Sequence, residues 1–129
     1  MIDRKNRVTL ASMLQRVCSK QLNGCQVHEE AKNIDSAEDR AVDSILMVLD
    51  LLFGGWETSP PVIDGDIGHL LCRCELFLRT DLEMKATVDQ FQRDGWLKRF
   101  DVDGFVTMIS NGVWPFESDE QIKNFQGIN

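Results

Sequence analysis

Both histidines of the chain lie three residues from a cysteine. Cys25 precedes His28, and His69 precedes Cys72. Thiolates and imidazoles are the ligands of structural zinc sites, and two of each complete a tetrahedral set. On a helix, His69 and Cys72 would share one face, and the segment with Cys25 and His28 could wrap towards them. The alternative is that these cysteines are small apolar side chains without a metal. We therefore expect no cofactor, with zinc at these four residues as the alternative.

A run of carboxylates occupies positions 29–43. Its members are Glu29, Glu30, Asp35, Glu38, Asp39 and Asp43. Asp35, Asp39 and Asp43 are spaced four residues apart, so a helix that began early enough would carry them on one face. Such a face is either the solvated side of a helix opposite the core or an acidic docking surface for a basic partner.

Aromatic residues follow glycines at two places in the chain. Trp56 comes after Gly54-Gly55, and Trp114-Pro115-Phe116 comes shortly after Asn111-Gly112. Aromatic side chains in such connecting segments either fill the ends of a helical bundle or act as apolar anchors for a bound protein. We therefore include Trp56, Trp114 and Phe116, with the acidic run, among the candidate partner-binding residues.

The sequence contains no motif that is typical of an enzyme. It has no phosphate-binding glycine loop and no nucleophile elbow. A helix of the zinc-protease type would start at His28, but Lys32 occupies the position of its second histidine. With two histidines in the whole chain, few groups can exchange protons near neutral pH. A non-enzymatic role is favoured, and acid–base chemistry by paired carboxylates is the enzymatic alternative.

The spacing of apolar residues predicts an all-α protein, a compact bundle of five to six helices with at most a short strand pair. We expect a single domain over residues 1–129. The expected helices are 9–22, 36–53, 66–94, 101–111 and 118–126, and 66–94 is favoured as two helices joined near 79–80. Residues 25–35 are a loop or a short helix. The helix over 36–53 carries the widest apolar stripe and is expected to be central, and a short strand at 62–63 or 112–114 stays open.

The chain of 129 residues carries a formal net charge of −7. Its one local basic cluster is Arg4, Lys5 and Arg7, at the start of the chain. Phosphate recognition needs clustered cations, so direct binding to nucleic acid or to an anionic membrane is disfavoured. The apolar run at 45–53 is too short to span a bilayer, and no secretory leader precedes the first helix. We expect a cytoplasmic protein with reduced thiols.

Taken together, these features predict a non-enzymatic protein-binding module: a small acidic inhibitor, immunity protein or adaptor that engages a basic protein partner. A zinc-stabilised regulatory domain and a small carboxylate enzyme are the two alternatives.

Overall fold

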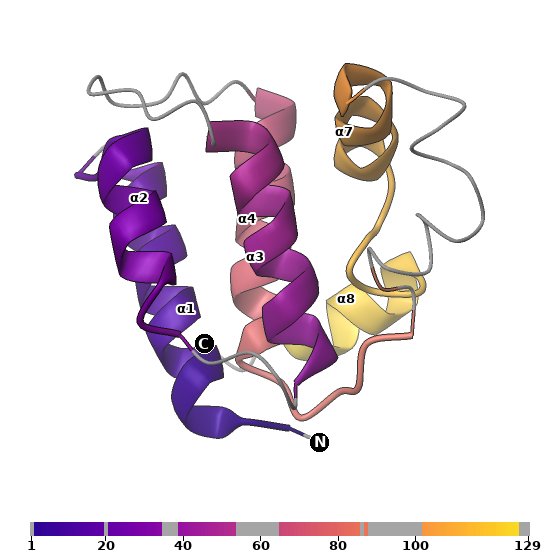
Figure 1. Cartoon of the computed structure of the whole chain (residues 1–129). Helices are drawn as coiled ribbons and strands as arrows, with labels where there is room; N and C mark the ends of the chain where they lie inside the picture. The colour runs from indigo at the N-terminus through magenta and orange to yellow at the C-terminus, as the bar shows by residue number, and fades with distance from the viewer. Residues whose placement is uncertain are drawn as a thin grey trace.

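The computed structural model describes residues 2–19, 21–34, 39–53, 65–85, 87 and 102–126. Within these ranges the chain forms six α-helices and no strand, which confirms the all-α bundle. The helices are α1 (Arg4–Cys18), α2 (Gly24–Ala31), α3 (Arg40–Phe53), α4 (Gly65–Leu78), α7 (Val102–Asn111) and α8 (Asp119–Gln126) (Figure 1). Residues 112–114 are not a strand, and 62–63 lie outside the described residues. That the whole chain is one domain stays a prediction.

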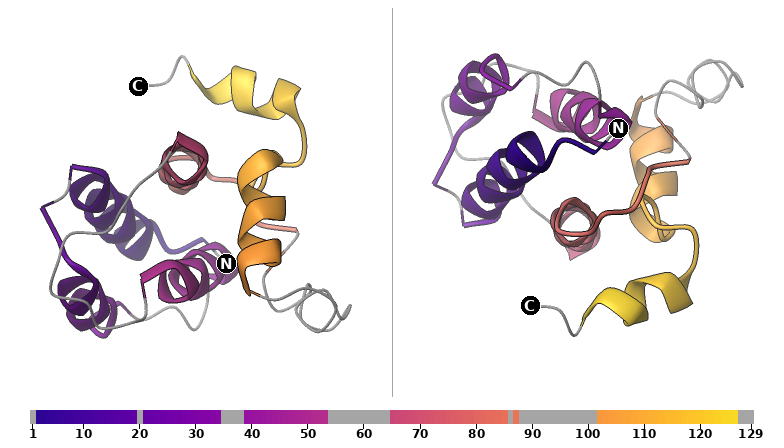
Figure 2. Two further views of the ribbon diagram at one scale, coloured as in Figure 1. Left: turned by 90° about the horizontal axis from the view of Figure 1, so that it is seen from above. Right: turned by 90° about the horizontal axis from the view of Figure 1, so that it is seen from below.

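The first four helices alternate in direction and stand side by side (Figure 1). Viewed along their axes, α1 and α3 occupy one pair of opposite corners of this arrangement, and α2 and α4 occupy the other pair (Figure 2). α7 packs against α3 and α4, and α8 packs against α4 on the side away from α3. α4 therefore stands between α8 and the rest of the bundle.

Short polar side chains fix the starts of the helices. Asp3 caps α1 by accepting a hydrogen bond from the backbone N–H of Asn6 at 3.1 Å. The first helix ends at Cys18, four residues before its expected end at 22, and Asn23 caps the start of α2. Its side chain accepts from the N–H of Gln26 at 2.8 Å, and the Gln26 side chain accepts from the N–H of Asn23 at 2.9 Å. This reciprocal capping makes residues 24–31 helical rather than a loop.

The long segment that starts at Asp66 is broken where the sequence suggested. α4 ends at Leu78, and a turn follows at residues 79–80. The expected new helix start at Thr80 is wrong, because residues 81–84 are not helical. The hydroxyl of Thr80 donates to the carbonyl of Phe77 at 2.7 Å, so it closes the last turn of α4 instead. Residues 88–94 lie outside the described part of the chain.

α3 is central, as expected: it packs against α1, α2, α4 and α7. Its core-facing side chains are Ala41, Val42, Ile45, Val48 and Leu49, and each is essentially inaccessible to solvent. They belong to one apolar cluster to which α1, α2, α3, α4 and α7 contribute buried side chains, and Ile122 and Phe125 of α8 pack against it. α3 is not buried all round, however, since Leu46 and Met47 are partly exposed. Among the described residues, no helix has both the length and the apolarity needed to cross a membrane.

Candidate protein-binding face

Asp39, expected on a solvated acidic face, is buried and paired. The Nε of Arg7 donates to Asp39 Oδ2 at 2.7 Å, and Nη2 donates to Oδ1 at 3.1 Å. The two side chains are 1% and 4% exposed, respectively. The carboxylate also accepts from the backbone N–H of Ala41 at 3.1 Å and so caps α3. Asp39 therefore cannot meet a partner, and the expectation that it lines a docking face with Asp43 is wrong.

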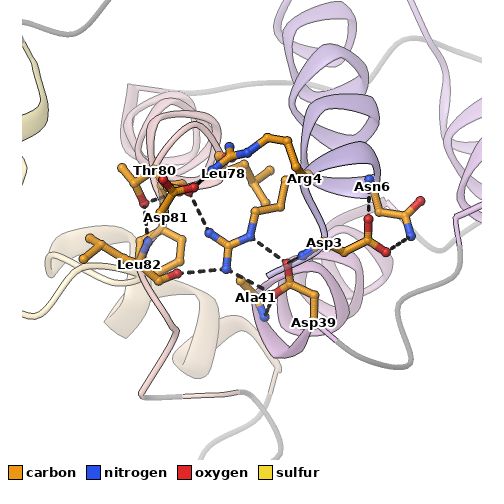
Figure 3. A network of polar contacts seen from close by, with 11 residues as sticks. Asp3, Arg4, Asn6, Asp39, Ala41, Leu78, Thr80, Asp81 and Leu82 are labelled. Atoms are coloured by element: carbon orange, nitrogen blue, oxygen red, sulfur yellow. Dashed lines mark hydrogen bonds and ion pairs between the residues drawn. The ribbon is translucent and has the colours of Figure 1, made fainter. Parts of the chain in front are cut away.

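The guanidinium of Arg7 also makes hydrogen bonds to the chain that follows α4. Arg7 donates to the carbonyl of Thr80 at 3.0 Å and to that of Leu82 at 2.8 Å, and its guanidinium carbon lies 5.6 Å from the ring centre of Phe77. Arg4 donates to the carbonyl of Leu78 at 3.1 Å and pairs with Asp81. Figure 3 shows these groups gathered where α1 and α3 begin and α4 ends. Arg7 and Asp39 at the centre of this network are buried, whereas Arg4 and Asp81 at its edge are exposed, and together these groups connect the ends of three helices.

Opposing effects set the charge state of Asp39. Burial alone would raise the pKa of this carboxyl group. The hydrogen bond and the charge of Arg7, together with the backbone N–H groups of Asp3 and Ala41, outweigh burial and lower the pKa below its ordinary value. Asp39 is therefore ionised in the folded protein at neutral pH.

The other described acidic residues of positions 29–43 point in different directions. Glu30 turns towards α1 and makes two hydrogen bonds to Arg16, at 2.5 and 3.1 Å. Glu29 of α2 pairs with Lys32, just past the end of that helix, at 3.2 Å. Asp43 is exposed on α3. Asp35 and Glu38 lie outside the described residues. The run therefore does not form one continuous acidic face.

Trp114 and Phe116 are core residues, 6% and 4% exposed, and not exposed anchors. The ring of Phe116 meets that of Phe77 edge-on, with centres 5.3 Å apart. Arg73 of α4 donates to the carbonyls of Trp114 at 3.0 Å and Ile109 at 2.8 Å, which ties this connector to α4. The expectation that these aromatic residues bind a partner is thus corrected to the other reading, in which they fill the end of the bundle. Trp56 lies outside the described residues.

A hollow of about 360 Å³ lies beside this connector. Its lining includes Met108, Ile109, Val113, Pro115 and the ion pair of Lys85 with Glu117, whose charged atoms are 3.4 Å apart. The lining is otherwise apolar and contains, among the described residues, no set of groups suited to acid–base catalysis.

The four expected zinc ligands are not brought together. Cys25 and His28 lie on α2, whereas His69 and Cys72 are exposed on α4. α2 and α4 stand at opposite corners of the four-helix arrangement (Figure 2). The segment with Cys25 and His28 was expected to wrap towards His69 and Cys72. Instead, the Asn23 cap holds this segment as a helix, so it cannot reach α4. In the described part of the chain, no three His, Cys, Asp or Glu side chains are grouped to hold a metal ion.

What remains on the surface of α3 is a short stripe of mixed chemistry. Asp43, Leu46, Met47 and Asp50 occur at positions i, i+3, i+4 and i+7 of the helix, so they share one side of it. The two aspartates are exposed, and the two apolar side chains are partly exposed. We call these four residues the α3 stripe.

The α3 stripe borders a small hollow of about 40 Å³ between α2 and α3. Leu46 and Asp50 line it from α3, and Val27, His28 and Ala31 line it from α2. The surface is therefore shallow and apolar along its middle, with a carboxylate at each end. This arrangement is suited to contact with another chain and lacks the depth of a small-molecule site.

Comparison of the chain with protein families, with curated proteins and with solved structures gave no match.

Proposed function

We propose that the protein is a non-enzymatic binding module that engages a basic segment of another protein through the α3 stripe. The observation that supports this is the combination of partly exposed Leu46 and Met47 with an exposed carboxylate on either side. A module of this kind would act as a small inhibitor, an immunity protein or an adaptor.

The chemistry of the stripe defines the partner. Asp43 and Asp50 are seven residues apart, which is about 10 Å along a helix. A partner helix with basic side chains about two turns apart, and apolar side chains between them, would match both the charges and the apolar middle. Burial of Leu46 and Met47 would supply binding free energy at about 25 cal/mol per Å² of apolar surface, less the cost of association.

The net charge of −7 supports a basic partner independently of the stripe. Long-range attraction raises the encounter rate of oppositely charged proteins, and charges at the rim of an interface act mainly on this rate. The apolar contacts act mainly on the rate of dissociation. The two parts of the stripe should therefore have separable kinetic effects.

A cross-linking experiment with a matched site tests the proposal. A photoreactive phenylalanine analogue is placed at Met47 in one variant and at Val8 in another. Val8 is the one large apolar side chain classed as exposed among the described residues, at 58%, and it lies on α1. Each variant is irradiated with a lysate of the native host, and the products are identified by mass spectrometry.

The expected result is a discrete protein adduct at position 47, with a basic segment at the cross-linked site, and no such adduct at position 8. The adduct should be lost in the double variant Asp43→Lys/Asp50→Lys. It should persist in Glu117→Lys/Glu120→Lys, which changes the charge equally on exposed residues near α8. An adduct at Val8 alone, or equal adducts in both charge variants, would show that the α3 stripe is not the binding surface.

A further inference from the structure

The hollow of about 360 Å³ beside the α7–α8 connector does not include the α3 stripe, since none of the four stripe residues is among its described lining residues. Three of the lining residues, Ile109, Trp114 and Phe116, are buried. Met108 and Val113 also line the hollow and are partly exposed. Small-molecule sites are concave, mostly apolar and about 300–1,000 Å³ in volume. The hollow therefore has the size and the lining of a small-molecule site.

Hydrogen bonds fix the shape of this connector. Arg73 donates to the carbonyl of Ile109 at 2.8 Å and to that of Trp114 at 3.0 Å. The backbone N–H of Phe116 donates to the carbonyl of Val113 at 2.9 Å. Because these contacts already hold the lining residues in place, little ordering of the protein is needed for a ligand to bind.

One cation and one anion lie at the open edge of the hollow. The Nζ of Lys85 and a carboxylate oxygen of Glu117 are 3.4 Å apart, and the two side chains are 76% and 50% exposed. They are the two charged residues among the described lining residues. An exposed ion pair contributes little to stability, so a ligand can separate these two charges at little cost.

These two opposite charges define the polar part of the ligand. A ligand with only a carboxylate would pair with Lys85 but would be repelled by Glu117, and a ligand with only an ammonium group would have the reverse problem. A zwitterion satisfies both side chains. In an α-amino acid the ammonium and carboxylate groups are attached to the same carbon atom, so they too are only a few ångströms apart.

We propose that this hollow binds a free apolar α-amino acid. The ammonium group of the ligand pairs with Glu117, its carboxylate pairs with Lys85, and its side chain contacts the apolar lining. A closed cavity of about 150 Å³ binds benzene, so a hollow of about 360 Å³ has room for an aromatic or branched aliphatic side chain and for the backbone atoms of the ligand. This site goes beyond the proposed binding of a basic protein, which uses none of these residues.

Three ligands with the same aromatic ring separate the contributions of the two charges. L-Phenylalanine carries both charged groups, phenylpropionate carries only the carboxylate, and phenethylamine carries only the ammonium group. Each is titrated into isotope-labelled protein, and the amide chemical shifts are followed by NMR. We expect L-phenylalanine to cause saturable shifts at residues 108–117 and to bind about fivefold more tightly than either of the others, which is the effect of one exposed ion pair.

The first variant fills the hollow. Gly112 lines it, and the nearest atom to a Cβ added there is the carbonyl oxygen of Met108 at 3.5 Å, an ordinary contact. Gly112→Leu should therefore fold, occupy part of the hollow and abolish the saturable shifts. Gly65→Leu is the matched control, because a Cβ at Gly65 meets no atom within 4 Å and Gly65 begins α4 without lining the hollow. This control should bind L-phenylalanine as the wild type does.

The second variant removes the cation. L-Phenylalanine should bind Lys85→Met about fivefold more weakly than the wild type and no better than phenethylamine does, because its carboxylate has lost its partner. Lys123→Met removes an exposed lysine of α8 instead and should keep the preference for L-phenylalanine.

The proposal is overturned if L-phenylalanine causes no saturable shift at residues 108–117, or if the three ligands bind equally well. It is also overturned if a folded Gly112→Leu variant binds L-phenylalanine like the wild type, or if Lys85→Met keeps the wild-type preference for L-phenylalanine over phenethylamine. Should Gly112→Leu fail to fold, the comparison of Lys85→Met with Lys123→Met decides.

Discussion

Arg7 connects three helices: its side chain, on α1, contacts Asp39 at the start of α3 and the backbone carbonyls that follow α4. Its buried guanidinium satisfies the Asp39 carboxylate and two carbonyls beyond the end of α4. Loss of one partner of a buried ion pair leaves the other charge without compensation, which is far more costly than loss of an exposed pair. The start of α3 and the chain that follows α4 are therefore both tied to this single side chain of α1.

We expect Arg7→Met to lower the free energy of unfolding by about 3–5 kcal/mol. Arg79→Met is the matched control, because Arg79 forms a surface pair with Glu75 of α4 and its loss should cost about 0–1 kcal/mol. Urea denaturation followed by circular dichroism measures both. Equal losses for the two variants would mean that the Arg7 network does not stabilise the fold as described.

Asp39 gives the fold a dependence on acid. Because its pKa is lowered in the folded state, the unfolded chain binds more protons as the pH falls, and the stabilisation is lost from about pH 4, the ordinary value for Asp, downwards. Above that pH the contribution is complete. Asp39→Asn lacks this titration and should be less stable than the wild type at neutral pH.

The difference in unfolding free energy between the wild type and Asp39→Asn should therefore be constant near neutral pH. It should shrink as the pH falls below about 4, because protonation leaves the wild type with the same uncompensated Arg7. Denaturant titrations from pH 7 downwards measure this difference. A difference that stays the same at the lowest pH where both proteins fold contradicts the proposed ionisation.

At the scale of helices, α3 has two sides with different roles. Leu49 is 1% exposed and faces the core, whereas Leu46 is partly exposed and belongs to the α3 stripe. Leu49→Ala should cost about 2–5 kcal/mol, because it removes buried surface and leaves a cavity. Leu46→Ala should cost clearly less, since that side chain is already in contact with solvent. Denaturant melts of both variants check the order, and a larger loss for Leu46→Ala would reverse the assignment of the two sides.

The connector between α7 and α8 is fixed by its aromatic residues. Trp114→Ala should lower stability by about 3–5 kcal/mol, because it empties part of the core. Phe125→Ala, at a partly exposed position on α8, provides the comparison and should cost less. Differential scanning calorimetry of the two variants tests this. An unchanged midpoint for Trp114→Ala would mean that the side chain is not needed to hold the connector in place.

Apolar spacing predicted most helices of the bundle, because it reports which side of a helix faces the core, but it left α2 open as a loop or a short helix and began α1 five residues late. It did not predict contacts between polar side chains that are far apart in the sequence. Arg4 and Arg7 were interpreted as a basic cluster at the start of the chain, and Asp39 as a surface charge, because no local pattern shows that they meet. One signal was present: Arg7 precedes Leu10 by three residues and so lies on the apolar face of α1.

The prediction of the partner-binding residues went wrong for a related reason. Sequence position gathers Glu29, Glu30 and Asp39, but the fold turns them towards solvent, α1 and the core. The α3 stripe was not identified because Leu46 was assigned to the core with the rest of the wide apolar stripe and Met47 was assigned to neither side. Only the packing of α3 between its neighbours determines which leucines stay partly exposed.

For the whole molecule, the described helices separate a structural junction from the proposed binding surface. The junction connects the starts of α1 and α3 with the end of α4, and the α3 stripe lies on the exposed and partly exposed side of α3. α8 is on the far side of α4 from α3 (Figure 2). Charge changes near α8 can therefore serve as controls for charge changes on the stripe.

The rate of association with the cross-linked partner tests the central proposal most directly. Stopped-flow measurements at increasing salt would compare the wild type, Asp43→Lys/Asp50→Lys and Glu117→Lys/Glu120→Lys. The melting temperature of each protein is measured as well, to check that it is folded. We predict that the stripe variant associates about tenfold more slowly at low salt and depends less on salt, while the control variant remains closer to the wild type. Equal rates and equal salt dependence in the two charge variants would contradict binding through the α3 stripe.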